Sequence, residues 1–202
     1  MTTVPGLTGP IYLGGYVISR GLASIDLKYE DAWTRQRARD GSLLVDRASP
    51  YTGCADLLRK VNITLGWPSL TIGEVRAINR LIARGGPHDV VLWNEEVEAF
   101  TGTGTSGTLA RRVALSVLSG DYLPAGASTR YATTGTQEED ESSVAITLGS
   151  VDANYRTPWT GNGTTGCVTV SYAAVYRCYF AEGQPTFAMP HQQGQNLRLE
   201  ES

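Results

Sequence analysis

The sequence predicts a mainly β protein: a β-sandwich flanked by one α-helix, with a long projecting hairpin and a small second β element. Three observations support this fold class. Several segments alternate apolar and polar residues with a period of two. One segment has helical spacing with cap signals at both ends. A long polar stretch carries Asp40 and Gly41, a turn signal typical of hairpins.

Short strands are expected before the helix. Residues 11–25 (IYLGGYVISRGLASI) predict one or two strands broken at Gly14 and Gly15. Residues 60–67 (KVNITLGW) predict a half-buried strand that ends before Pro68. Its apolar residues alternate with polar or small ones: Val61, Ile63 and Leu65.

Residues 26–53 predict a long hairpin with polar side chains on both faces. Such a hairpin has no core of its own, so it is either mobile or packed against another chain. We therefore take five of its residues as candidates for a subunit interface: Trp33, Arg35, Arg37, Arg39 and Asp40.

Residues 72–84 predict an amphipathic helix. Thr71 and Glu74 have the spacing of a capping box, and Gly85 and Pro87 end the helix. One face carries an apolar stripe: Val75, Ile78, Leu81 and Ile82. A different face carries arginines four residues apart: Arg76, Arg80 and Arg84. These arginines indicate either a solvated face or a contact with a neighbouring subunit, because arginine is enriched at interfaces.

The rest of the chain reads as strands and loops. The expected strands are a buried one at 89–93, then 112–118, 129–134 and 143–148, and the longest at 167–180 with a bulge or bend at Ala173 and Ala174. The tail, NLRLEES, predicts a closing strand. We expect residues 1–105 with 166–202 to form the sandwich, and residues 106–165 to form an accessory β element.

The sequence offers little for catalysis. Gly102, Gly104 and Gly107 match G-x-G-x-x-G, but the acidic run 94–100 separates them from the buried strand and no βαβ pattern follows, so a Gly/Thr-rich loop is expected. His88 and His191 are each expected in solvated loops without metal-ligand spacing. The acidic run 138–141 lacks calcium-loop spacing and is expected to be a solvated loop. We predict no catalytic residue, no cofactor and no metal, and hence no enzyme.

Composition bears on the binding partners and on the cellular compartment of the protein. The chain has 202 residues and a net charge of −3, which argues against a general nucleic-acid-binding surface. Cys54, Cys167 and Cys178 have no CxxC pair, and we expect buried free thiols in a reducing compartment. The N-terminus shows no signal-peptide pattern, and no apolar run is long enough to cross a bilayer.

The order of these parts resembles the tail-tube-like domain of long-tailed bacteriophages, and more specifically their distal tail proteins. The resemblance lies in residues 74–102 (EVRAINRLIARGGPHDVVLWNEEVEAFTG), a helix leading into a strand that flanks the sandwich in this family. It lies also in residues 183–202 (GQPTFAMPHQQGQNLRLEES), which finish on a leucine-containing strand and a closing Glu-Glu. Residues 109–165 match no particular accessory domain of the family.

The resemblance implies a structural virion protein, assembled in the host cytoplasm. Six copies would form a ring that joins the tail tube to the tail tip or baseplate, with the tube protein and the tip or hub proteins as partners. The long hairpin would reach a neighbouring subunit. DNA would pass through the lumen without specific binding, which suits a slightly acidic chain. No membrane is involved.

Three alternatives stay open at this point. Within the family, the chain could be a tail tube or tail terminator subunit. In a different class, it could be a carbohydrate-binding β-sandwich module. A nucleotide-dependent enzyme is the most distant alternative.

Overall fold

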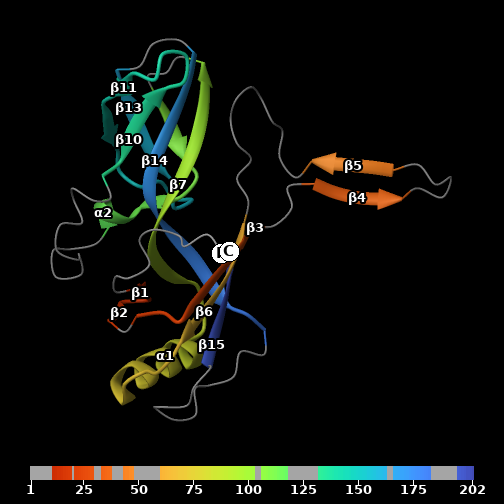
Figure 1. The fold of residues 1–202 in the computed structure, drawn as a ribbon, viewed down its shortest axis with the longest axis vertical. Helices are drawn as coiled ribbons and strands as arrows, with labels where there is room; N and C mark the ends of the chain where they lie inside the picture. The colour runs from red at the N-terminus through yellow and green to blue at the C-terminus, as the bar shows by residue number, and fades with distance from the viewer. Residues whose placement is uncertain are drawn as a thin grey trace.

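The computed structural model describes residues 11–19, 21–29, 33–37, 43–47, 60–102, 106–117, 132–162, 166–182 and 195–202. Strands predominate in this part of the chain, which holds a single helix longer than one turn (Figure 1). The predicted mainly β class with one flanking helix is confirmed.

The largest unit is a curled sheet of ten strands. Along its main path the strands are β2 (Tyr16–Ile18), β1 (Ile11–Leu13), β7 (His88–Gly102), β14 (Gly166–Phe180), β15 (Gln195–Glu201), β6 (Val61–Trp67) and β3 (Ser24–Tyr29). Three shorter strands branch from it: β9 (Arg112–Val113), β10 (Thr134–Gln137) and β11 (Ser143–Val144).

Strand β14 organises this sheet. One edge of β14 pairs with β7 along most of its length. The other edge pairs in succession with β10, β9 and β15. Between Ala173 and Val175 the pairing with β7 shifts register, so residues 92–94 lie opposite the single Ala174. The sequence predicts a bulge or bend at this position, and the extra residues lie on β7.

A smaller sheet faces β7 and β14 at the end of these strands away from α1 (Ile72–Arg84) (Figure 1). It comprises β12 (Ile146–Leu148), β13 (Thr157–Gly161) and β8 (Ser106–Leu109). Its Trp159 packs edge-on against Phe100 of β7, with ring centroids 5.2 Å apart. A Cβ at Gly107 would lie 2.6 Å from Trp159 Nε1, so only glycine allows this contact. The two layers form the sandwich part of the molecule, seen at the upper end of Figure 1.

The other end of the long strands is closed by the N-terminal hairpin and by α1 (Ile72–Arg84) (Figure 1). Strands β1 and β2 are joined by Gly14 and Gly15, both at positive φ, as a two-residue hairpin requires. A Cβ on Gly14 would lie 2.9 Å from Leu81 of α1. The turn can therefore lie directly on the helix.

Helix α1 has the predicted bounds and caps. The Thr71 hydroxyl accepts a hydrogen bond from the Glu74 backbone N–H, and the Glu74 carboxylate accepts one from the Thr71 N–H. Val75, Ile78 and Leu81 are buried in the main core, and Ile82 packs against that core. The predicted apolar stripe is therefore the buried face.

The hairpin predicted over residues 26–53 is shorter than expected. Residues 26–29 belong to β3 of the large sheet, whereas residues 33–37 and 43–47 form a separate two-stranded sheet. Strand β4 (Trp33–Arg37) pairs with β5 (Leu43–Arg47), and Arg37 lies opposite Leu43 (Figure 1). Residues 38–42, which include the predicted Asp40–Gly41 turn, lie outside the described residues.

Three local expectations were wrong. Strand β7 continues through the acidic run to Gly102 and equals β14 in length, whereas the sequence indicated a strand over 89–93. In the described part of the segment 112–118, Arg112 and Val113 are extended and α2 (Ala114–Val117) follows. Residues 143–148 contain two strands, because Ala145 separates β11 of the large sheet from β12 of the small one.

The predicted accessory element divides between the two sheets. Strands β8, β12 and β13 pair with one another, whereas β9, β10 and β11 belong to the large sheet. Leu109, Val113, Val144 and Trp159 are buried in the same core as residues of α1 and β6. The boundary proposed at residues 105 and 166 remains a prediction.

Removing the helix cap should weaken the fold measurably. We expect Thr71→Ala to lower the free energy of unfolding by about 1 kcal/mol, because the Glu74 N–H loses its acceptor. Thr71→Ser keeps a hydroxyl and should lose much less. Urea denaturation of the three proteins measures the difference. Equal stability of Thr71→Ala and wild type would contradict a stabilising role for this cap.

Candidate functional site

A polar ladder lies on the inward face of β7, between the two ends of the molecule. Asn94, Glu96 and Glu98 project from alternate positions, where an apolar strand would place core residues. The phenol of Tyr176 on β14 donates a hydrogen bond to Glu96 and accepts one from Asn94. The phenol of Tyr172, also on β14, donates to Glu98. The ladder is therefore hydrogen-bonded across the two central strands.

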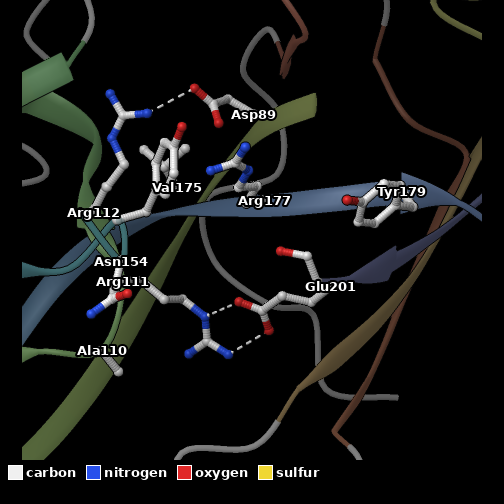
Figure 2. Close-up of a pocket in the computed structure, with 11 residues that line it drawn as sticks. Asp89, Ala110, Arg111, Arg112, Asn154, Val175, Arg177, Tyr179 and Glu201 are labelled. Carbon is white, nitrogen blue, oxygen red and sulfur yellow. Dashed lines mark hydrogen bonds and ion pairs between the residues drawn. The ribbon is translucent and has the colours of Figure 1, made fainter. Parts of the chain in front are cut away.

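Arg111 provides the positive charge for this ladder. It lies at the corner between β8 and β9, and its side chain is 5% exposed. Its Nε and Nη2 donate to the two oxygens of Glu201 on β15, at 2.6 and 2.7 Å (Figure 2). Its Nη1 lies 3.5 Å from Glu96. Burial alone would lower the pKa of Arg111, but Glu201 and Glu96 raise it overall, so the guanidinium stays charged.

The carboxyl group of Glu98 has a raised pKa. Burial raises its pKa above the ordinary value of 4.5, and the nearby charge of Glu96 adds to the effect. Hydrogen bonds from Tyr172 and from the Ala110 N–H, together with the charge of Arg111, oppose this rise without cancelling it. Glu98 therefore takes up a proton more readily than an exposed glutamate.

Next to this ladder the surface is hollowed into a cavity of about 210 Å³. We call it the arginine pocket, because Arg111, Arg112 and Arg177 line it together with Asp89 and Tyr155. Arg112 Nη1 lies 3.0 Å from Asp89 (Figure 2). Arg111 is neutralised by Glu201 and Glu96, as described above. Arg177 has no carboxylate partner among the described residues, and the side chains that line the pocket carry three positive charges and two negative ones, Asp89 and Glu201.

Tyr155 forms the outer wall of the arginine pocket. The Arg177 guanidinium carbon lies 3.6 Å from the Tyr155 ring centroid, and that of Arg112 lies 5.5 Å away. Tyr155 has φ of 61°, a conformation that residues with a Cβ rarely adopt. The Asp152 carboxylate imposes it by accepting hydrogen bonds from the Asn154 and Arg156 N–H groups. The loop thus holds an exposed tyrosine against two arginines.

The predicted interface residues lie elsewhere. Arg76, Arg80 and Arg84 are exposed on the outer face of α1, which is compatible with either interpretation of this stripe. Trp33, Arg35 and Arg37 are on β4. Arg39 and Asp40 lie outside the described residues. The structure does not bring the helix residues and the arginine pocket into one cluster, and the role of the predicted residues as an interface stays a prediction.

Two expectations about single residues need correction. His88 is 7% exposed at the start of β7, where its Nε2 lies 3.2 Å from the Leu81 carbonyl. Burial lowers its pKa, so it is not a solvated loop residue. Cys167 is disulfide-bonded rather than free. Cys178 is a buried free thiol, as expected. Cys54 and His191 lie outside the described residues.

The acidic run agrees better with expectation. Residues 138–141 form an exposed turn between β10 and β11. The Gln137 N–H donates to the Ser142 carbonyl, and the Ser142 N–H donates to Asp140. The Ser142 hydrogen bonds lower the pKa of Asp140.

Sequence reasoning missed the polar ladder and the arginine pocket. The run NEEVEAF alternates in the sequence, which is a strand signal, but its inward positions are charged. Their partners, Arg111 and Glu201, are distant in the sequence, so no local pattern connects them. Paired arginines at 111 and 112 before a short apolar segment were the available signal.

Comparison with other proteins gives no further indication. No protein-family model matches the chain, and no curated protein does. Within the described ranges, no group of three or more His, Cys, Asp or Glu residues is arranged to hold a metal ion. No described helix is long and apolar enough to span a membrane.

Removing the buried guanidinium should be strongly destabilising. We expect Arg111→Met to lower the free energy of unfolding by about 3–5 kcal/mol, because Glu201 and Glu96 would remain buried without their cation. Arg156→Met removes an exposed arginine nearby and should change stability by less than about 0.5 kcal/mol. Chemical denaturation compares them. Similar small losses in both variants would contradict the assigned role of Arg111.

Glu98 should give the fold a distinct pH dependence. Its raised pKa contributes stability that is fully present below pH 4.5 and is lost as pH rises through the folded-state value. Wild type should therefore lose stability relative to Glu98→Gln as pH rises above about 4.5. Urea denaturation at successive pH values measures this slope. Glu95→Gln, on the exposed face of β7, should run parallel to wild type. If the difference in unfolding free energy between wild type and Glu98→Gln does not change with pH, the raised pKa of Glu98 would be contradicted.

Proposed function

We propose that this chain is a structural virion protein that forms a hexameric ring at the distal end of a phage tail and joins the tail tube to the tail tip. The observation that carries the proposal is the open, curled sheet. Its path ends in β2 on one side and β3 on the other, and no described strand pairs on the outer side of either. Unpaired edges are templates for pairing with another chain. In a ring, β2 of one copy would meet β3 of the next.

The composition of edge strand β2 supports this use. Tyr16 and Val17 are 36% and 39% exposed, although both are large and apolar. The separate β4–β5 hairpin adds a second element able to reach a neighbour. Both features leave surface that a second copy would cover.

One face of the sheet has the properties expected of a lumen. Strands β3, β6 and β15 align their outward residues in three rows. The rows are Ser24, Gly66 and Asn196; Asp26, Thr64 and Arg198; Lys28, Asn62 and Glu200. The face carries two charges of each sign and no apolar side chain in these rows. A surface of balanced charge would let DNA pass without the counterion release that drives tight binding.

The disulfide at Cys167 also supports a virion setting. Disulfides persist in oxidising surroundings, which include the surfaces of virus particles. An assembled tail spends its working life in such surroundings.

A tail tube or tail terminator subunit remains the alternative within the same class. A tape-measure gene upstream and a tip gene downstream would support the distal position over these two. For the carbohydrate-binding alternative, Tyr179 offers an exposed ring, whereas the ring of Tyr155 lies against Arg177. Saturable binding by a monomer on a glycan array would favour it.

The proposal predicts that purified wild-type protein forms six-fold rings in negative-stain images. A single change at the β2 edge should prevent this. Leu13 and Tyr16 flank the turn and form its hydrogen-bonded pair, so the backbone groups of Val17, in the next pair, point outward. Val17→Pro removes that outward N–H and should leave the protein monomeric by light scattering.

Val17→Thr is the control, since it keeps the backbone donor and should still form rings. Thermal denaturation establishes that both variants are folded. A wild type that stays monomeric at high concentration would refute the ring. Rings formed by folded Val17→Pro would refute the role of the β2 edge while leaving the ring intact.

A further inference from the structure

We infer that the arginine pocket receives the acidic turn 138–141 of a second copy of this chain. This inference rests on the proposed ring and specifies a contact within it. The pocket offers one cation without a carboxylate partner, Arg177. The turn offers four exposed carboxylates: Glu138, Glu139, Asp140 and Glu141. The two surfaces are thus complementary in charge.

The pocket is built to take a carboxylate. Its cavity of about 210 Å³ has room for a glutamate side chain. Arg177 is held in place by stacking on Tyr155, so its planar donors need little further ordering. The Nε of Arg112 is buried and has no hydrogen-bond partner among the described residues. An incoming carboxylate would pair with Arg177, and Arg112 also lines the pocket.

The turn is equally well ordered. The Glu138 N–H donates to the Cys167 carbonyl, which fixes the turn beside the start of β14. Hydrogen bonds at Gln137 and Ser142 close it. Glu141 has φ of 56°, as in a tight turn. Four like charges in a fixed turn repel one another, and a cationic partner would relieve that repulsion.

The turn cannot reach the pocket of its own chain. It is attached at Cys167 of β14, whereas the pocket lies at Arg177, ten residues along the same strand. At 3.3 Å per residue this separation is about 33 Å. The contact therefore needs a second molecule. Because it joins two different surfaces, it is a head-to-tail contact, which forms a ring when the rotation between successive copies closes.

The composition around the pocket fits a protein partner. Tyr155 and Tyr179 line it and are 40% and 46% exposed. Tyrosine and arginine are the residues most enriched at the energetic centres of protein interfaces. A small free anion would use Arg177 but would leave both tyrosines uncovered.

The test is charge reversal with rescue, measured by sedimentation velocity on the full chain. Arg177→Glu should raise the dissociation constant of the ring at least about 30-fold. The double variant Glu138→Lys with Glu141→Lys reverses the charge of the acidic turn and should raise the dissociation constant of the ring by a similar factor. Combining all three changes in one chain should restore assembly, because each reversed surface again meets an opposite charge. Arg156→Glu, in the same loop but outside the pocket, is the matched control and should assemble like wild type.

Mixing provides a second measurement. Arg177→Glu and the Lys-turn variant should each be monomeric alone and should assemble together, since each supplies the surface the other lacks. Thermal denaturation of every variant confirms folding. Rings that survive both reversals would overturn this contact and leave the proposed function standing. If Arg177→Glu prevents assembly and neither the triple variant nor the mixture restores it, the pocket has another occupant. This result would overturn the inference that the acidic turn occupies it.

The remaining outcomes separate the two proposals. A strictly monomeric wild type overturns both the ring and the contact. A thermal shift with free glutamate that Arg177→Glu abolishes, with assembly unchanged, would make the pocket a small-anion site and overturn the inference.

Discussion

The buried guanidinium of Arg111 is the constraint on which the rest of the structure depends. It is 95% buried, and a charge so placed is stable only with partners in good geometry. Those partners come from β7 and β15, and the Glu201 that binds it also accepts the backbone N–H of Val61 on β6. Four parts of the chain must therefore reach their places together. A one-residue slip of β15 would turn Glu201 to the opposite face and leave the cation unpaired.

Besides its main core the molecule has a second, smaller apolar cluster: Val91, Trp93, Ala114, Ala173 and Val175. Apolar residues lie at both ends, under the small sheet and under α1, and they form one continuous core. The polar ladder of Glu96 and Glu98 lies between them, beside the register shift at Ala174. Strand β9 pairs with β14 at the same level on the edge opposite β7, and this places Arg111 next to the ladder. Charge is thus distributed unevenly along β14, acidic at the turn near Cys167 and basic near Arg177.

Local patterns predicted the elements whose causes are local. The capping box at Thr71 and Glu74 and the glycine at 85 set the bounds of α1 correctly, because cap interactions span only a few residues. The bend at Ala173 and Ala174 was visible because two small residues interrupt an alternating strand. In contrast, Leu115 appeared to continue a strand from Val113, but only two residues there find a partner on β14 and a helical turn follows.

The candidate site was less predictable, because the residues that interact in it are far apart in the sequence. Nothing near Glu96 or Glu98 in the sequence indicates that a guanidinium and two tyrosines will surround them. Charged residues in a strand usually face water, so the run 94–100 was taken to separate a strand from a loop. Tyr155 is similar, since its position against Arg177 depends on how Asp152 shapes the loop. Such residues become recognisable only when the fold brings their partners together.

Cys178 has a consequence of a different kind. It is fully buried in the main core, and burial together with the charge of Glu201 raises the pKa of its thiol. A thiol that is both enclosed and protonated does not react with alkylating reagents in the native state. It becomes reactive only when β14 separates from β15 or from the core beneath it. The rate at which this sulfur is labelled therefore reports how often the centre of the sheet opens, and no residue has to be substituted to introduce the thiol.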